Sequence, residues 1–207
     1  TIILTNNAYI NIERGKVTFK NCKFIAHDDG APIKNDYMIV AKGREILEIS
    51  HCEFHGHSRR SGIRNEDGQL IVKNCIFEKL YGEGHGILTS YRQLECYDSS
   101  FSSCRVVDDS PLIVNHNETD LDSGVKLYKC IFTDCAAPSL SSVWSFNNYD
   151  SYDYYLLKII KCNFSHFYCT ESFFTDFDDV QYISVVDSIW DGPRDDPKEV
   201  QKMWDKE

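Results

Sequence analysis

Hydrophobic and polar positions recur along the chain in an eight-residue pattern that is present seven times. In its first copy, "VTFKNCKF" (17–24), positions one, three and eight are apolar and the sixth is a cysteine. The sixth position is Cys in five copies and Ser in two, and the eighth is Phe in six copies and Trp in the last. The copies begin at residues 17, 47, 70, 94, 125, 157 and 183. Repetition at this period indicates a solenoid.

The spacing inside the pattern predicts two strands joined by a corner. Val17 and Phe19 are two residues apart, so both side chains point to the same face of a strand. The Cys and Phe at positions six and eight form a second such pair. The step between the two pairs is three residues, so the chain must bend at Lys20–Asn21 to keep both pairs inside.

A third apolar stretch follows most copies, as in "GILTS" (86–90) and "PLIVN" (111–115). Three short strands per repeat predict an all-β fold, a parallel β-helix in which each coil pairs with the next at about 4.8 Å. We expect about seven coils within residues 1–192.

A leucine-rich repeat is the alternative fold, because "LEISHCEF" (47–54) matches the core of that repeat. A leucine-rich repeat also needs an apolar residue three positions before its core. The residues at those positions are Arg14, Arg44, Asp67, Tyr91, Asp122, Tyr154 and Val180. The connecting segments carry turn-forming residues and no helical period. The β-helix is therefore favoured.

The Cys-x-Phe segments "NCKF", "NCIF", "KCIF" and "KCNF", together with "GHGI", carry a family resemblance. The chain resembles the right-handed parallel β-helix group, the pectin-lyase-like superfamily. Within that group it is most similar to the Cys-Phe repeat proteins of the polymorphic-outer-membrane-protein type. The resemblance covers about residues 8–192 and implies the fold, which hosts many different functions.

The chain contains nine cysteines, and an odd number argues against a fully paired extracellular framework. Those at the sixth repeat position are Cys22, Cys52, Cys75, Cys130 and Cys162. We interpret them as small core side chains, since Ser99 and Ser188 take the same position. Their spacing is not that of a zinc site, and we predict no metal. A disulfide between Cys104 and Cys135 stays open, because both have the same register in neighbouring coils.

Residues 193–207 are predicted to form a short helix. Asp196 suits the N-cap, Pro197 the first helical position and Glu199 the third. This helix would cover the open sheet edge at the end of the β-helix. A linker to a further domain is the alternative.

Gly84-His85-Gly86 resembles the G-H-G motif of polygalacturonases, which share this fold. In that family an Asp-Asp pair precedes the motif and an R-x-K follows it. Here Asp108-Asp109 comes after the triplet and no R-x-K follows. A glycine-rich turn is the favoured interpretation, and no catalytic residue is assigned; His85, Asp108 and Asp109 are the catalytic candidates.

A stripe of polar residues is the first candidate binding site. Its members lie at similar numbers of residues from the first position of their repeats, in four consecutive repeats. They would therefore lie side by side in a β-helix. They are Asp28, Asp29, Arg59, Arg60, His85, Asp108 and Asp109. Paired carboxylates at a suitable separation cleave glycosidic bonds, so the stripe could serve an enzyme. The alternative is a solvated loop edge.

A tyrosine-rich segment, "VWSFNNYDSYDYY" (143–155), is the second candidate binding site. Its tyrosines beside carboxylates are Tyr149, Tyr152, Tyr154 and Tyr155. Such rings can stack on sugars or anchor a protein partner. Alternatively, they fold back over the sheet.

The formal net charge of -10 and the absence of a basic stripe argue against a nucleic-acid partner. No apolar run is long enough to cross a bilayer, so this segment is not expected to insert directly. Two glycosylation-acceptor patterns, at Asn117 and Asn163, favour a secreted or cell-surface location.

Two functions are compatible with these features. The favoured one is a non-catalytic β-helix scaffold of a larger surface or secreted protein, which binds a protein or carbohydrate through its loops. The alternative is a polysaccharide lyase or glycoside hydrolase acting on acidic sugars. That enzyme could use Ca²⁺ to offset the negative charge of the protein; no other cofactor is expected.

Overall fold

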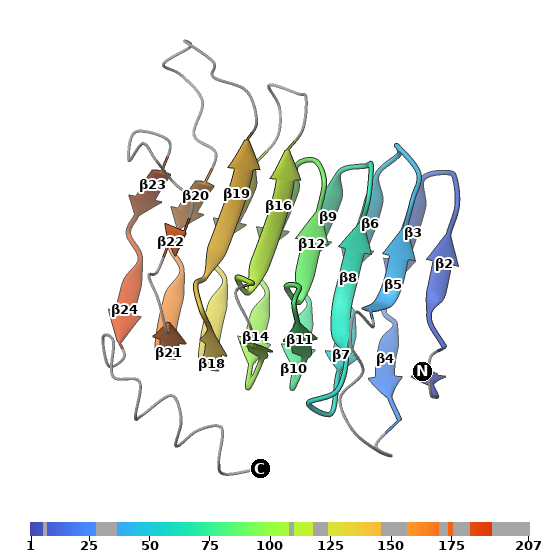
Figure 1. Ribbon diagram of the computed structural model, residues 1–207, viewed down its shortest axis with the longest axis horizontal. Helices are drawn as coiled ribbons and strands as arrows, with labels where there is room; N and C mark the ends of the chain where they lie inside the picture. Colours follow the sequence, from blue (N-terminus) through green and yellow to red (C-terminus); the bar gives the residue numbers. More distant parts are fainter. Residues whose placement is uncertain are drawn as a thin grey trace.

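The computed structural model describes residues 1–5, 8–27, 37–107, 110–117, 124–145, 157–169, 174–175 and 183–191. Over these residues the chain is a three-sided solenoid of parallel strands (Figure 1). The described part contains strands, turns and no helix. In particular, it offers no helical segment that could span a bilayer. Residues 193–207, where a capping helix is predicted, lie outside the described residues.

Three parallel sheets, here called A, B and C, form the sides of the solenoid. Sheet A contains β1 (Ile2–Leu4), β4 (Lys23–Ala26), β7 (Glu53–His55), β10 (Ile76–Glu78), β11 (Tyr81–Glu83), β14 (Ser100–Ser102), β15 (Arg105–Val107), β18 (Ile131–Ala137), β21 (Asn163–Cys169) and β24 (Ile189–Asp191). Sheet B contains β2 (Ile10–Ile12), β5 (Tyr37–Ala41), β8 (Ser61–Asn65), β12 (Leu88–Ser90), β16 (Ile113–Asn117), β19 (Ser141–Ser145) and β22 (Phe174–Thr175). Sheet C contains β3 (Val17–Lys20), β6 (Leu47–Ser50), β9 (Leu70–Lys73), β13 (Leu94–Tyr97), β17 (Val125–Tyr128), β20 (Leu157–Ile160) and β23 (Ile183–Val186).

Each coil runs from sheet B through sheet C to sheet A, as β5, β6 and β7 do in the second coil. The strands of sheet C are the first halves of the seven repeat copies, and sheet C has seven strands. The predicted all-β parallel β-helix is thereby confirmed. The leucine-rich-repeat alternative does not hold, because each coil has three strands instead of a strand and a helix.

The predicted corner lies at the fifth position of the repeat. All seven residues there have a left-handed backbone, with φ between 46° and 56°. They are Asn21, His51, Asn74, Asp98, Lys129, Lys161 and Asp187. A single left-handed residue redirects the chain from sheet C to sheet A, and we call this position the C-to-A corner. Because the corner shifts the side-chain alternation, positions three and six both face inward.

Phenylalanine rings from the eighth repeat position stack through the centre of the solenoid. Neighbouring ring centroids, from Phe24 to Phe164, are 4.6–5.0 Å apart and the rings are within 15° of parallel. This separation is close to the spacing between paired strands, about 4.8 Å. The stack ends at Trp190, whose ring lies 5.7 Å from that of Phe164. The backbone register between coils therefore also sets the packing of the core.

The cysteines are buried in this interior, apart from the half-buried Cys22, and all nine thiols are free. Cys104 and Cys135 are therefore both free thiols in this structure, and no disulfide joins them. Burial raises the pKa of Cys75 to about 11. Burial also raises the pKa values of Cys52 and Cys135. These thiols are held in the protonated form, which is the less reactive one.

Candidate functional site

A cluster of polar and aromatic side chains lies on the outer face of sheet B in the second to fourth coils. It combines Tyr37 from β5, Arg64 from β8, Thr89 from β12, and the adjoining His85 and Tyr91. The backbone register pairs Arg64 with Thr89, which places both side chains on the same face of the sheet. We call these five residues the sheet B cluster.

Tyr37 is the centre of the sheet B cluster. Its hydroxyl lies 2.8 Å from the Thr89 Oγ1, and its ring centroid lies 4.6 Å from that of His85. The Tyr37 side chain is buried, and burial raises the pKa of its hydroxyl well above the usual value. Tyr37 is therefore neutral, and its ring fixes the position of the imidazole beside it.

His85 lies in the Gly-His-Gly turn, and its Nδ1 donates to the Glu83 carbonyl at 2.8 Å. Gly84 has a φ of 70°, and a Cβ on Gly82 would lie 2.2 Å from the His85 carbonyl oxygen. The glycines are thus required by the turn, as predicted. The imidazole is 8% exposed, and its Nε2 is buried with no hydrogen-bond partner.

The pKa of His85 is lowered, chiefly because the imidazole is removed from water. The Glu83 carbonyl opposes this shift, and the positive charge of Arg64 adds to it. His85 is therefore a neutral imidazole at physiological pH. Its Nε2 carries a lone pair that only a hydrogen-bond donor can satisfy.

Arg64 and Tyr91 form the half-buried rim of the cluster. The Arg64 Nη2 donates to the Tyr91 hydroxyl at 3.3 Å, and the guanidinium carbon lies 5.7 Å from the Tyr91 ring centroid. The Arg64 Nε lies 3.1 Å from the Glu66 Oε1. The rim therefore presents a planar cation, an aromatic ring and a carboxylate close together.

The structure buries Arg60 in the connection from sheet A to sheet B. Its side chain is 2% exposed. Nη1 donates to the Ala8 carbonyl at 2.6 Å, and Nη2 donates to the Tyr37 carbonyl at 3.2 Å. Arg60 thus ties the second coil to the third and to residue 8. The physical reason is that a buried guanidinium needs hydrogen-bond acceptors, which these two backbone carbonyls supply.

Arg59, the neighbouring member of the predicted stripe, donates from Nη1 to the His27 carbonyl at 2.8 Å. Of the predicted stripe, the structure thus brings Arg60 and His85 to the same tyrosine, Tyr37. The other predicted positions lie outside the described residues. They are Asp28, Asp29, Asp108, Asp109, Tyr149, Tyr152, Tyr154 and Tyr155.

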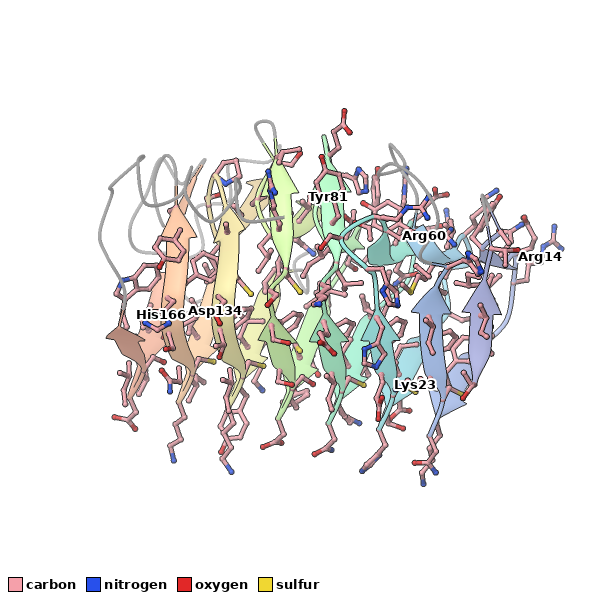
Figure 2. The ribbon with its side chains drawn as sticks, turned by 90° about the horizontal axis from the view of Figure 1, so that it is seen from below. Arg14, Lys23, Arg60, Tyr81, Asp134 and His166 are labelled. Atoms are coloured by element: carbon pink, nitrogen blue, oxygen red, sulfur yellow. The ribbon has the colours of Figure 1, made fainter. Side chains whose placement is uncertain are left out.

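Ion pairs also lie on the outer face of sheet A, away from this cluster. The two ring nitrogens of His55 lie 3.0 Å from a Glu53 oxygen and 2.9 Å from a Glu78 oxygen. Towards the other end, His166 and Asp134 on neighbouring coils approach to 3.2 Å (Figure 2). Over the described ranges, no three His, Cys, Asp or Glu side chains are grouped to hold a metal ion.

The model of a protein family described as "Right handed beta helix region" matches residues 2–153. The chain therefore belongs to the right-handed β-helix family, which agrees with the predicted fold and handedness. No curated protein and no solved structure matches the chain. The closer resemblance to the polymorphic-outer-membrane-protein type stays a prediction.

Proposed function

We propose that the protein is a non-catalytic β-helix scaffold that binds a carbohydrate on the outer face of sheet B. The observation that carries this proposal is the sheet B cluster, in which a half-buried rim lies over a rigid buried layer. Arg64 and Tyr91 form the rim. Tyr37, His85 and Thr89 form the layer beneath. A binding site needs this kind of support, because locked side chains lose little freedom when a ligand arrives.

The chemistry of the rim suits a sugar. An aromatic ring packs against the apolar face of a pyranose, and a guanidinium donates in a plane to hydroxyl or carboxylate oxygens. Glu66, beside Arg64, can accept from sugar hydroxyls. These three side chains supply an apolar surface, donors and an acceptor in one place.

The position of His85 favours binding over catalysis. A general acid or base must come within hydrogen-bond distance of the substrate. The His85 Nε2 is shielded by the side chains around it, and its Nδ1 is used by the Glu83 carbonyl. His85 therefore supports Tyr37 and contributes to the shape of the site.

The test is calorimetric binding of neutral and acidic oligosaccharides, followed by analysis of each mixture for new reducing ends. We expect at least one oligosaccharide to bind without being cleaved, and Arg64→Ala and Tyr91→Ala to weaken it about tenfold or more. Arg44→Ala is the matched control, because Arg44 is exposed and pairs with Asp67 outside the cluster. Cleavage of an oligosaccharide that is lost in His85→Ala would overturn the proposal and indicate an enzyme. Binding of a protein but of no oligosaccharide would show that the ligand is not a carbohydrate.

A further inference from the structure

Lysines gather on one part of sheet C and its C-to-A corner, in a way that opposes the stability of the sheet. Lys126 and Lys158 are directly opposite each other in the register of β17 and β20. Lys129 and Lys161 occupy the C-to-A corner of the same two coils. Like charges directly opposite each other destabilise a pair of strands.

Charged side chains are arranged differently on the strands of sheet C nearer the N-terminus. There the Lys73 Nζ lies 3.0 Å from the Glu48 Oε1, so the charges of neighbouring coils cancel. In the described part of the chain, by contrast, Lys129 and Lys161 have no carboxylate at ion-pair distance, and Lys126 lies opposite Glu95 in the register without forming an ion pair with it.

Tyrosine rings lie among these lysines. The Lys126 Nζ lies 5.2 Å from the Tyr97 ring centroid, and the Lys129 Nζ lies 5.2 Å from that of Tyr128. Each ammonium group is thus held over an aromatic face and remains available to an anion.

Exposed aliphatic side chains flank the same corner. Ile131 is 48% exposed, Val186 is 45% exposed and Ile189 is 63% exposed. Ile131 and Ile189 are in the same outward row of sheet A, on either side of Asn163. Val186 ends β23 in sheet C, just before the last C-to-A corner.

Together these residues cover part of sheet C and its C-to-A corner, with aliphatic groups beside the lysines. We call this surface the lysine ridge. Its members are Tyr97, Lys126, Tyr128, Lys129, Ile131, Lys158, Lys161, Val186 and Ile189.

We propose that the lysine ridge docks the protein onto the surface of an anionic lipid bilayer. Lysines are attracted to anionic headgroups, and tyrosines suit the boundary between headgroups and acyl chains. Exposed aliphatic groups gain from shallow burial at that boundary. A soluble polyanion would use the lysines and leave Ile131, Val186 and Ile189 in water, so the combination favours a lipid surface. The ridge lies on the bilayer and does not cross it.

Acidic residues are unevenly distributed among the connections of the solenoid. The segments 118–123, 146–156 and 176–182 each join a strand of sheet B to one of sheet C, and they contain eight carboxylates and no Lys or Arg. The C-to-A corners of the Lys129 and Lys161 coils are single basic residues, and the corners of the coils on either side are Asp98 and Asp187. In a three-sided coil this corner lies opposite sheet B.

The experiment is flotation of the full chain with vesicles of phosphatidylcholine alone and of phosphatidylcholine with phosphatidylserine. We expect binding to the anionic vesicles alone, with loss at raised salt. Lys129→Glu/Lys161→Glu should lower the bound fraction about tenfold or more, and Ile131→Ser/Ile189→Ser should lower it severalfold. Two double variants with matched chemistry serve as controls and should bind like the parent chain: Lys16→Glu/Lys20→Glu and Ile3→Ser/Ile76→Ser.

A parallel arm with dextran sulfate separates the lipid surface from a polyanion. Binding to dextran sulfate with no binding to anionic vesicles would overturn the proposal, as would vesicle binding that both ridge variants retain. Circular dichroism establishes that each variant is folded. If the isoleucine variant is unfolded, the bound fraction of the lysine variant and the loss of binding at raised salt test the proposal without it. Because the ridge and the sheet B cluster are on different sides of the solenoid, glycan binding by the ridge variants reports separately on the proposed function.

Discussion

The hydroxyl of Ser99 and the thiol of Cys75 take the same place in neighbouring coils and make the same hydrogen bond. Ser99 Oγ donates to the Tyr97 carbonyl at 2.8 Å, and Cys75 Sγ donates to the Lys73 carbonyl at 3.2 Å. In both coils the bond spans the left-handed residue of the C-to-A corner. The remaining copies repeat it, through Cys22, Cys52, Cys130, Cys162 and Ser188. The side chain at the sixth repeat position therefore fills the core and also makes a hydrogen bond across the corner, which we call the corner brace.

From the corner brace we predict how substitution of Cys75 changes the free energy of unfolding. Cys75→Ser should cost about 1 kcal/mol or less, because a hydroxyl can make the same bond. Cys75→Ala should cost about 1–3 kcal/mol, because it removes the donor and leaves a small cavity. Urea unfolding followed by circular dichroism measures both. The brace would be rejected if Ala were tolerated better than Ser.

The corner residue itself gives a second prediction. Asn74 has a φ of 52°, a conformation that β-branched residues avoid. Asn74→Val should therefore lower the free energy of unfolding by about 1–2 kcal/mol, whereas Asn74→Gly should change it by less than about 1 kcal/mol. Equal losses in the two variants would show that the backbone conformation of Asn74 is not what matters.

Thiol accessibility gives a third prediction. Since Cys75 has a pKa of about 11 and the other cysteines except Cys22 are buried, alkylation of the native protein near pH 8 should be slow at these eight sites. Cys22 is half-buried and should react first. Mass spectrometry of peptides after brief labelling measures this order, with urea-unfolded protein as the control that labels at nine sites. Rapid labelling of Cys75 or Cys135 in the folded protein would contradict the structure.

The lowered pKa of His85 predicts a dependence of stability on pH. The unfolded chain takes up a proton near pH 6.5, while the folded chain holds His85 neutral to lower pH. Below about pH 6.5 the unfolded state therefore binds more protons, and the free energy of unfolding should fall as the pH falls. Chemical unfolding between pH 5 and 7.5 measures the slope.

His85→Gln should make that slope shallower. His51→Gln, at an exposed corner position, is the control for replacing a histidine with glutamine. A slope that is identical in the parent chain and in His85→Gln would show that His85 does not titrate as the structure implies.

Much of the fold could be predicted from the repeat alone. The step of three between Phe19 and Cys22 required a corner, and the left-handed φ of Asn21 confirms its place. The recurring Phe predicted a shared interior, which the ring stack from Phe24 to Phe164 confirms. These features depend on local spacing, which a sequence displays directly.

The candidate site was harder to predict, because it depends on loops whose lengths differ. The position of Arg60 within its repeat predicts a place in the polar stripe, but its side chain is buried and donates to the Tyr37 carbonyl. Tyr37 itself was missed, since an aromatic residue that opens an apolar strand usually indicates core. Arg64 was the available signal: a charged residue in the middle of the third apolar stretch of its repeat.

The coil-to-coil register is the central claim, and an engineered crosslink tests it most directly. Glu95 and Lys126 are opposite each other on neighbouring coils, whereas Lys158 lies one coil further along. Glu95→Cys/Lys126→Cys should form a disulfide on mild oxidation, because paired strands are about 4.8 Å apart. Glu95→Cys/Lys158→Cys should not, because two coil spacings exceed the reach of a disulfide. Crosslinking of the second pair but not of the first would contradict the register and the solenoid built on it.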